Sequence, residues 1–279
     1  MQQLTENVWV ETGKRGSNHG VVRTAEGLVL IDGPQKPSDT LRLKAEIEQQ
    51  GELKYILNTE PHGDHWTSNA YFDVPVVSHR GVRERMLETD MDAHVKRVAT
   101  FGPEEALLLD GYQANLPVIT FEDDLKLFVG DHTFRLISMP GHTPYQLAVL
   151  IEEEGVVFTS DNVFCKVQMW IQEGDPDQWL QALESLRGLG AETLVPGHGP
   201  VTDNGYLHEQ GAFVSEWVDY VKGAVDRGVP KEQAIESLTA LTDRYPMDVE
   251  QEGMAPRVMQ MNVANLYDYH TAAGIHAAQ

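Results

Sequence analysis

A loop of six residues with the sequence EPHGDH, at positions 60–65, constrains this chain more than any other stretch. Its candidate metal ligands are Glu60, His62, Asp64 and His65. The loop follows a short apolar run at residues 55–57 and precedes an expected helix start. Neighbouring side chains of a strand point to opposite faces, so alternate residues at a strand end can enter one pocket. The loop therefore predicts a metal site rather than a polar surface turn.

The second half of the chain repeats this arrangement of a short apolar strand followed by a polar turn. His142 lies in the turn PGHT, His198 lies in the turn PGHG, and Asp161 directly follows another strand. The candidates now number too many for one tetrahedral zinc, but they suit two metals that share a bridging carboxylate and a bridging hydroxide. The full set is Glu60, His62, Asp64, His65, His142, Asp161 and His198.

Alternation and helical spacing of apolar residues predict the remaining elements. Strands are expected at residues 4–12, 21–24, 28–33, 54–58, 75–78, 124–129, 133–138, 148–152, 156–159 and 193–195. Helices are expected at 37–50, 81–99, 176–189, 207–227, 231–245 and 257–272. Ser38 is the expected N-cap of the first helix. The irregular segment 101–117 is predicted to be a lid or a pocket wall.

The net charge of −22, from 43 acidic and 21 basic residues, argues against binding to nucleic acid or to anionic membranes. No signal peptide and no run of membrane-spanning length is visible. The single cysteine, Cys165, excludes an intramolecular disulfide and fits a reducing compartment. We therefore expect a cytoplasmic protein with a small-molecule substrate, and a homodimer is left open.

The histidine turns and the order of the candidate ligands resemble the metallo-β-lactamase superfamily over roughly residues 4–200. The resemblance is to its glyoxalase II and lactonase-like branch, and it implies an α/β fold, the αββα four-layer sandwich. It also implies a catalytic domain at 1–205 and a helical C-terminal extension at 206–279, packed on the same domain. Carried over by position, Glu60, His62 and His142 would hold one metal, Asp64, His65 and His198 the other, and Asp161 would bridge them. Asp32 matches an acidic residue that hydrogen-bonds a ligand rather than binding metal.

Glu60 departs from the family pattern, which usually has histidine at this position. Two divalent cations carry four positive charges, and the three carboxylates with one bridging hydroxide supply four negative ones. The extra oxygen ligand favours harder metals. We therefore expect two divalent ions, zinc above all, with manganese or iron as alternatives because of Glu60.

The resemblance implies a binuclear metallo-hydrolase in which a metal-bridging hydroxide attacks a carbonyl group. The expected substrates are esters, lactones, thioesters or amides, and Asp64 is the expected catalytic residue that orients the nucleophile or carries a proton. His19, Trp66 and Trp170 are candidates for the substrate pocket. The alternative is an iron-binding redox enzyme of dioxygen or sulfur chemistry on the same fold, because the site is rich in carboxylates.

Overall fold

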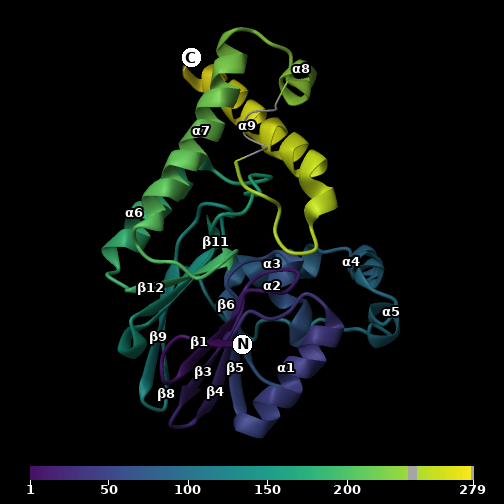
Figure 1. Cartoon of the computed structure of the whole chain (residues 1–279), viewed down its shortest axis with the longest axis vertical. Helices are drawn as coiled ribbons and strands as arrows, with labels where there is room; N and C mark the ends of the chain where they lie inside the picture. Colours follow the sequence, from purple (N-terminus) through teal and green to yellow (C-terminus); the bar gives the residue numbers. More distant parts are fainter. Residues whose placement is uncertain (238–243, 278–279) are drawn as a thin grey trace.

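Two β-sheets lie face to face in the computed structural model of this protein, which describes residues 1–237 and 244–277 (Figure 1). The first sheet has seven strands in the order β1-β2-β3-β4-β5-β6-β7, and the second has five in the order β12-β11-β10-β9-β8. The strands of the first sheet are β1 (Gln2–Gln3), β2 (Val8–Glu11), β3 (His19–Thr24), β4 (Gly27–Ile31), β5 (Leu53–Leu57), β6 (Val76–His79) and β7 (Ile119–Phe121). Those of the second are β8 (Asp124–Val129), β9 (His132–Ser138), β10 (Leu147–Ile151), β11 (Val156–Phe164) and β12 (Thr193–His198).

Helices cover the outer faces of both sheets and form the C-terminal part of the described chain (Figure 1). The α-helices are α1 (Pro37–Gln50), α2 (Gly63–Trp66), α3 (Arg80–Glu88), α4 (Met91–Val98), α5 (Glu105–Leu108), α6 (Pro176–Gly188), α7 (Tyr206–Asp226), α8 (Lys231–Glu236) and α9 (Ala255–Ala277). Short 3-10 turns are η1 (Thr67–Tyr71), η2 (Ala99–Phe101), η3 (Glu152–Glu154) and η4 (Glu252–Met254). None of the helices in the described ranges combines the length and apolar character needed to cross a membrane.

Strand β4 shows why the sequence forms layers. Val29 and Ile31 point into the core between the two sheets, where they join residues of the second sheet. Leu28 and Leu30 point to the opposite face and pack with α1. Because both faces of the strand are buried, its sequence is an uninterrupted apolar run rather than an alternation of apolar and polar residues.

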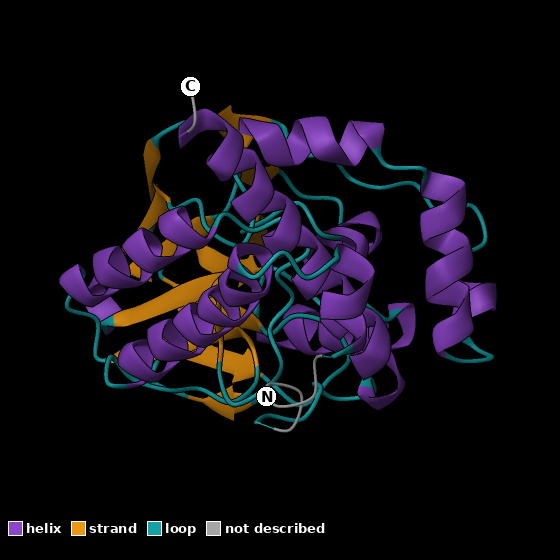
Figure 2. Cartoon of the chain, turned by 90° about the horizontal axis from the view of Figure 1, so that it is seen from above, coloured by secondary structure: helices purple, strands orange, loops and turns teal. Residues whose placement is uncertain are grey.

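The outer face of the second sheet is covered by α6 and α7, and α9 packs on α7, so that all three helices share one continuous apolar cluster. Leu150 and Val157 of the sheet contact this cluster, which includes Trp179 of α6, Phe213 of α7 and Val263 of α9. The view from above shows helices lying over the strands (Figure 2). The order of layers is therefore helix, sheet, sheet, helix, which confirms the predicted αββα fold with its helical extension. The division into domains at residue 205 stays a prediction.

Several predicted elements differ from those observed. The helix expected at 81–99 is two helices, α3 and α4, because Asp90 caps a new helix by accepting a hydrogen bond from the amide of Ala93. Ser38 is not an N-cap, since Lys36 holds that position and the Ser38 hydroxyl donates to Glu105 instead. Of the helix expected at 231–245, α8 ends at Glu236, and residues 238–243 lie outside the described part.

Two pairs of parallel strands bring polar turns to one edge of the sandwich. In the first sheet β4 and β5 are parallel, and in the second sheet β11 and β12 are parallel. Parallel neighbours end at the same edge, so the loops that follow them lie close together. The EPHGDH loop follows β5, and β12 ends on His198. The edge therefore collects the predicted ligands from both sheets.

Candidate metal centre

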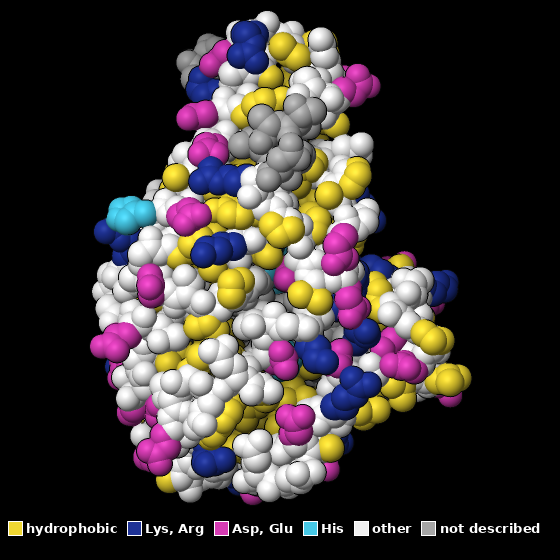
Figure 3. Space-filling view, viewed as in Figure 1, with side chains coloured by type: hydrophobic (Ala, Val, Ile, Leu, Met, Phe, Trp, Pro, Cys, Tyr) yellow, Lys and Arg dark blue, Asp and Glu magenta, His cyan; other side chains and the backbone are white. Residues whose placement is uncertain are grey.

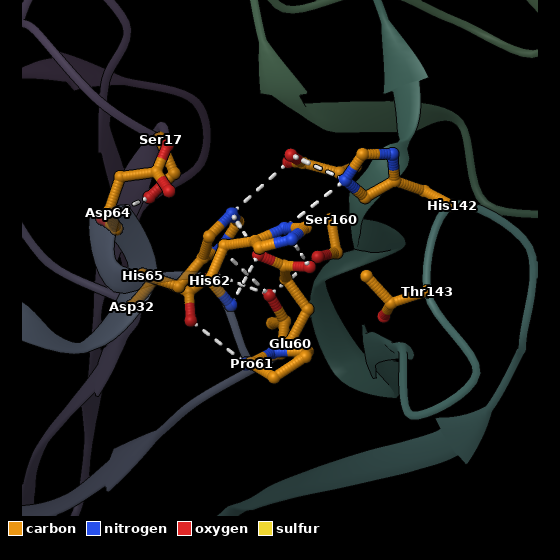
Figure 4. A network of polar contacts seen from close by, with 12 residues as sticks. Ser17, Asp32, Glu60, Pro61, His62, Asp64, His65, His142, Thr143 and Ser160 are labelled. Atoms are coloured by element: carbon orange, nitrogen blue, oxygen red, sulfur yellow. Dashed lines mark hydrogen bonds and ion pairs between the residues drawn. The ribbon is translucent and has the colours of Figure 1, made fainter. Parts of the chain in front are cut away.

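The seven predicted ligands converge at this edge. Figure 4 labels five of them, namely Glu60, His62, Asp64, His65 and His142. They form three overlapping groups, and within each group one ligand atom per residue lies within 4.8 Å of the others. Figure 4 shows Glu60, His62 and His65, which follow β5 of the first sheet, facing His142, which follows β9 of the second. The groups are Glu60, His62 and His142; Asp64, His65 and His198; and Glu60, His65 and Asp161. This is the partition expected for two neighbouring metal positions with Asp161 between them.

Local backbone geometry aims the ligands inward. The amide of His62 donates to Oε1 of Glu60 at 2.9 Å, which turns the loop tightly after β5. Gly197 lets β12 pass directly beside Asp161, because a β-carbon there would lie 1.9 Å from Asp161 Oδ1. Glycine is therefore required at this point of the PGHG turn.

Unpartnered buried atoms test whether these residues fit a metal. Oε2 of Glu60, Nε2 of His65 and Oδ1 of Asp161 are buried and have no hydrogen bond of normal geometry in the described residues. This holds even though Nε2 of His65 lies 3.2 Å from Oδ1 of Asp161. Buried polar atoms are almost always paired, so atoms that face one another unpaired indicate a missing common partner. A donor set of imidazole nitrogens and carboxylate oxygens suits divalent metals.

Three of the four histidines are held by a carboxylate on the ring nitrogen that faces away from the centre. His65 Nδ1 lies 2.9 Å from Asp32 Oδ2, and His62 Nε2 lies 2.7 Å from Glu173 Oε1. His198 Nδ1 lies 2.8 Å from Asp248 Oδ2. A carboxylate behind a histidine fixes its orientation and makes it a more basic ligand.

Asp32 was predicted for this position, whereas Glu173 and Asp248 were not. Asp32 has a φ of 53°, in the left-handed region that aspartate tolerates better than most residues. From there it accepts hydrogen bonds from the backbone amide and the hydroxyl of Thr59 as well as facing His65. Glu173 precedes α6 and Asp248 precedes α9, and no local motif surrounds either residue.

The carboxylates shift the pKa values of the site. Burial alone would lower the pKa of His62, but the charge of Glu60 and the hydrogen bond to Glu173 raise it to about 10. Burial likewise opposes the raised pKa of His65 and of His198, which their acidic neighbours outweigh. Burial lowers the pKa of His142, whose ring packs edge-on against Phe164 and Trp179.

A cavity of about 370 Å³ opens over the predicted ligands. Trp170 lines it, as predicted, and Phe101 brings the start of segment 101–117 to its wall. His19 and Trp66 do not line it, so their proposed pocket roles are corrected. His19 is buried in β3 opposite Glu11, and the Trp66 indole donates to the carbonyl oxygen of Pro61 while its ring stacks on His94.

Two sheets packed face to face between helices, with clustered ligands at one edge, define an αββα protein with a candidate two-metal centre. A sequence model described as the metallo-beta-lactamase superfamily matches residues 12–198. The chain belongs to the metallo-β-lactamase superfamily, which confirms the resemblance seen in its motifs.

Known relatives share this similarity over different lengths. "Beta-lactamase-like protein 2 homolog" of Caenorhabditis elegans is 22% identical over 192 residues, which are 68% of this chain and 58% of the relative. "Hydroxyacylglutathione hydrolase" of Methylococcus capsulatus is 29% identical over 147 residues, 51% of this chain and 46% of the relative. The chain therefore spans about half the length of these curated relatives. The solved metallo-beta-lactamase from Pontibacter korlensis superposes with a TM-score of 0.61 at 21% identity, covering 77% of this chain and 97% of that one, which shows a shared fold.

Replacing Asp248 with alanine is expected to weaken metal binding about 10- to 100-fold, the usual effect of removing a carboxylate behind a ligand histidine. Asp248 is 6% exposed and contacts Nδ1 of His198, so its loss frees that ring to turn. Asp248→Asn keeps a hydrogen-bond acceptor but loses the charge, so its metal affinity should lie between those of the wild type and Asp248→Ala. Competition with a chelator measures the affinity. Asp226→Ala, an exposed carboxylate near the end of α7, is the control, and equal affinities for Asp248→Ala and the wild type would contradict the assignment.

Proposed function

We propose that this chain is a metal-dependent hydrolase that acts on the carbonyl group of a small-molecule ester, lactone, thioester or amide. The observation that carries the proposal is the convergence of seven metal-binding side chains, several with unpaired buried atoms, beneath an open cavity. Membership of the metallo-β-lactamase superfamily supports it. So does similarity to a protein named hydroxyacylglutathione hydrolase, although that similarity covers half of this chain.

Each residue has a defined place in this proposal. Two divalent cations, when bound, would lower the pKa of a water molecule and polarise the substrate carbonyl oxygen. The first would be held by Glu60, His62 and His142. The second would be held by Asp64, His65 and His198. Asp161 would bridge the two positions.

Asp64 is a charged carboxylate at neutral pH, which suits a residue that orients water better than one that carries a proton. Burial raises its pKa, but the hydrogen bond from His198 and the charge of His65 lower it overall, so the side chain is a carboxylate at neutral pH. Asp64 also lines the cavity. It can therefore accept a hydrogen bond from a water molecule and align it for attack, while its low pKa disfavours taking up a proton.

A second candidate function is iron-dependent redox chemistry, and the number of carboxylates favours it. Glu60, Asp64 and Asp161 supply oxygen ligands, which suit harder metals such as iron and manganese better than sulfur ligands would. The native metal therefore separates the two functions. Zinc in a colourless protein supports hydrolysis, and visible iron absorption in protein purified in air supports redox chemistry.

Metal quantification together with a substrate screen tests the proposal. Protein purified without added metal is expected to contain two divalent ions per chain and to hydrolyse at least one of a lactone, a thioester, an aryl ester and a β-lactam. Asp64→Asn should lower the rate while leaving the fold intact, as judged by circular dichroism. The proposal would be overturned if the metal-containing protein turned over none of these substrates faster than the metal-free protein does.

A further inference from the structure

Positive charge gathers at the cavity, although the protein as a whole is strongly acidic. Apart from the predicted ligands, the charged side chains that line the cavity are three arginines. No other carboxylate lines it among the described residues, whereas the chain has a net charge of −22. On the face drawn in Figure 3, basic side chains gather between the C-terminal helices and the region of α4 and α5, where acidic side chains also occur. The three arginines are Arg15, Arg97 and Arg257.

The arginines come from three separate parts of the chain. Arg15 lies in the loop between β2 and β3, Arg97 lies in α4, and Arg257 lies in α9. Within the described ranges, none of them forms an ion pair with a carboxylate, whereas most other arginines there do. An arginine without a carboxylate partner keeps its hydrogen-bond donors available for a ligand.

Arg15 is held in place without being neutralised. Its guanidinium carbon lies 4.0 Å from the ring centre of Phe101, and its Nη1 donates to the carbonyl oxygen of Glu250. Its Nη2 lies 3.8 Å from Sδ of Met254, and its Nε is buried without a hydrogen-bond partner in the described chain. A fixed guanidinium loses little conformational entropy on binding a ligand.

Like charges lie close together here. Burial is the main cause of the lowered pKa of Arg15; the charges of Glu250 and Asp64 oppose it, and the positive charge of Arg97 adds to it. The predicted metal centre would not need these charges, because its three carboxylates and one hydroxide would balance two divalent cations. Three unpaired cations at the mouth of one cavity therefore attract an anion from solution.

We propose that Arg15, Arg97 and Arg257 form an anion-binding subsite for a carboxylate or phosphate group of the substrate, remote from the carbonyl that is attacked. The inference rests on the proposed function for the identity of its ligand as a substrate. Apolar wall residues Phe101, Trp170 and Met254 would contact the body of that ligand. A cavity of about 370 Å³ suits a small organic anion rather than a polymer.

Direct binding of a probe tests the subsite independently of turnover. Benzenesulfonate is an oxyanion that binds metals weakly, and methyl phenyl sulfone is its neutral counterpart of similar size. Calorimetry on the metal-loaded protein is expected to show about tenfold tighter binding of the sulfonate, equivalent to about 1.4 kcal/mol. The difference should shrink as ionic strength rises, because salt screens charges at an exposed site.

Matched variants identify the residues. Arg97→Gln and Arg257→Gln alter exposed side chains, so their folds should be unaffected, and combining them should remove most of the preference for the anion. Arg187→Gln, on the exposed face of α6 and paired with Glu184, should keep it. Equal affinity for both probes in the wild type, undetectable binding of both, or an unchanged preference in the double variant would overturn the subsite. If the protein hydrolyses a neutral ester but shows no preference for the anion, the proposed function stands and the subsite is wrong. If it binds the anion but hydrolyses none of the substrates, the subsite stands and the proposed function is wrong.

Discussion

Replacing Glu60 with alanine is expected to lower kcat/KM about a thousandfold, because it removes a predicted ligand from the centre of the site. Glu60 is fully buried and belongs to two of the three ligand groups. Its Oε2 lies 3.0 Å from Nδ1 of His62, and its Oε1 lies 3.2 Å from Nε2 of His65. Metal content, measured on the purified variant, should fall below two per chain.

Glu60→His is the matched control for this change, since histidine is the usual family residue. It should retain two metals, and its preference should shift towards zinc because a nitrogen ligand replaces an oxygen. Circular dichroism and the Tm of each variant separate a lost ligand from a lost fold. Near wild-type turnover and metal content in Glu60→Ala would show that Glu60 is not a ligand.

The fold followed from local sequence because buried strands and amphipathic helices carry their own patterns. Helix α1 has the predicted bounds, 37–50, since its apolar residues repeat at helical spacing between Pro37 and Gly51. Most of the predicted ligands could also be read locally, because the EPHGDH loop follows β5 and His198 ends β12. Asp161 differs from the prediction, since it lies within β11, which continues to Phe164 instead of ending at residue 159. What failed was side-chain direction. Trp66 is next to the metal loop in sequence but points into the core.

The residues that hold the ligand histidines and the cavity wall in place could not be found from local sequence motifs, because their partners are distant in sequence. Glu173 contacts His62 across 111 positions, and Asp248 contacts His198 across 50. Arg15 reaches Glu250 across 235 positions. The contacts of Asp248 and Glu250 arise only when the segment before α9 packs over the cavity, and that of Glu173 arises when the segment before α6 does. No single stretch of the sequence encodes this packing.

Removing the metals is expected to abolish hydrolysis and to leave several of the ligand histidines protonated. The pKa of His62 is raised to about 10 and the pKa values of His65 and His198 are also raised, so the metal-free folded protein holds these rings protonated at pH 7. Their ordinary pKa of 6.5 leaves them mostly neutral in the unfolded chain at that pH. The charged pairs therefore stabilise the metal-free fold fully below about pH 6.5, and this stabilisation is lost as pH rises towards the raised values.

Metal binding must displace these protons, because a histidine ligates only through a neutral nitrogen. Returning metal to chelator-treated protein at pH 7 should therefore release about two to three protons per chain, since the lowered pKa of His142 means that it contributes none. Calorimetry in two buffers of different ionisation enthalpy measures this number. Metal at 1,000-fold above its Kd should also stabilise the fold by about 4 kcal/mol.

A histidine away from the centre provides the control for proton release. His132 also has a raised pKa, which burial opposes and which its hydrogen bonds to Glu154 and Asp131 cause, but it belongs to none of the ligand groups. His132→Gln should leave the number of released protons unchanged, whereas His62→Gln should reduce it by about one. Identical binding enthalpies in both buffers would mean that the site is not protonated without metal. The carboxylates would then set the geometry of the histidines without setting their charge.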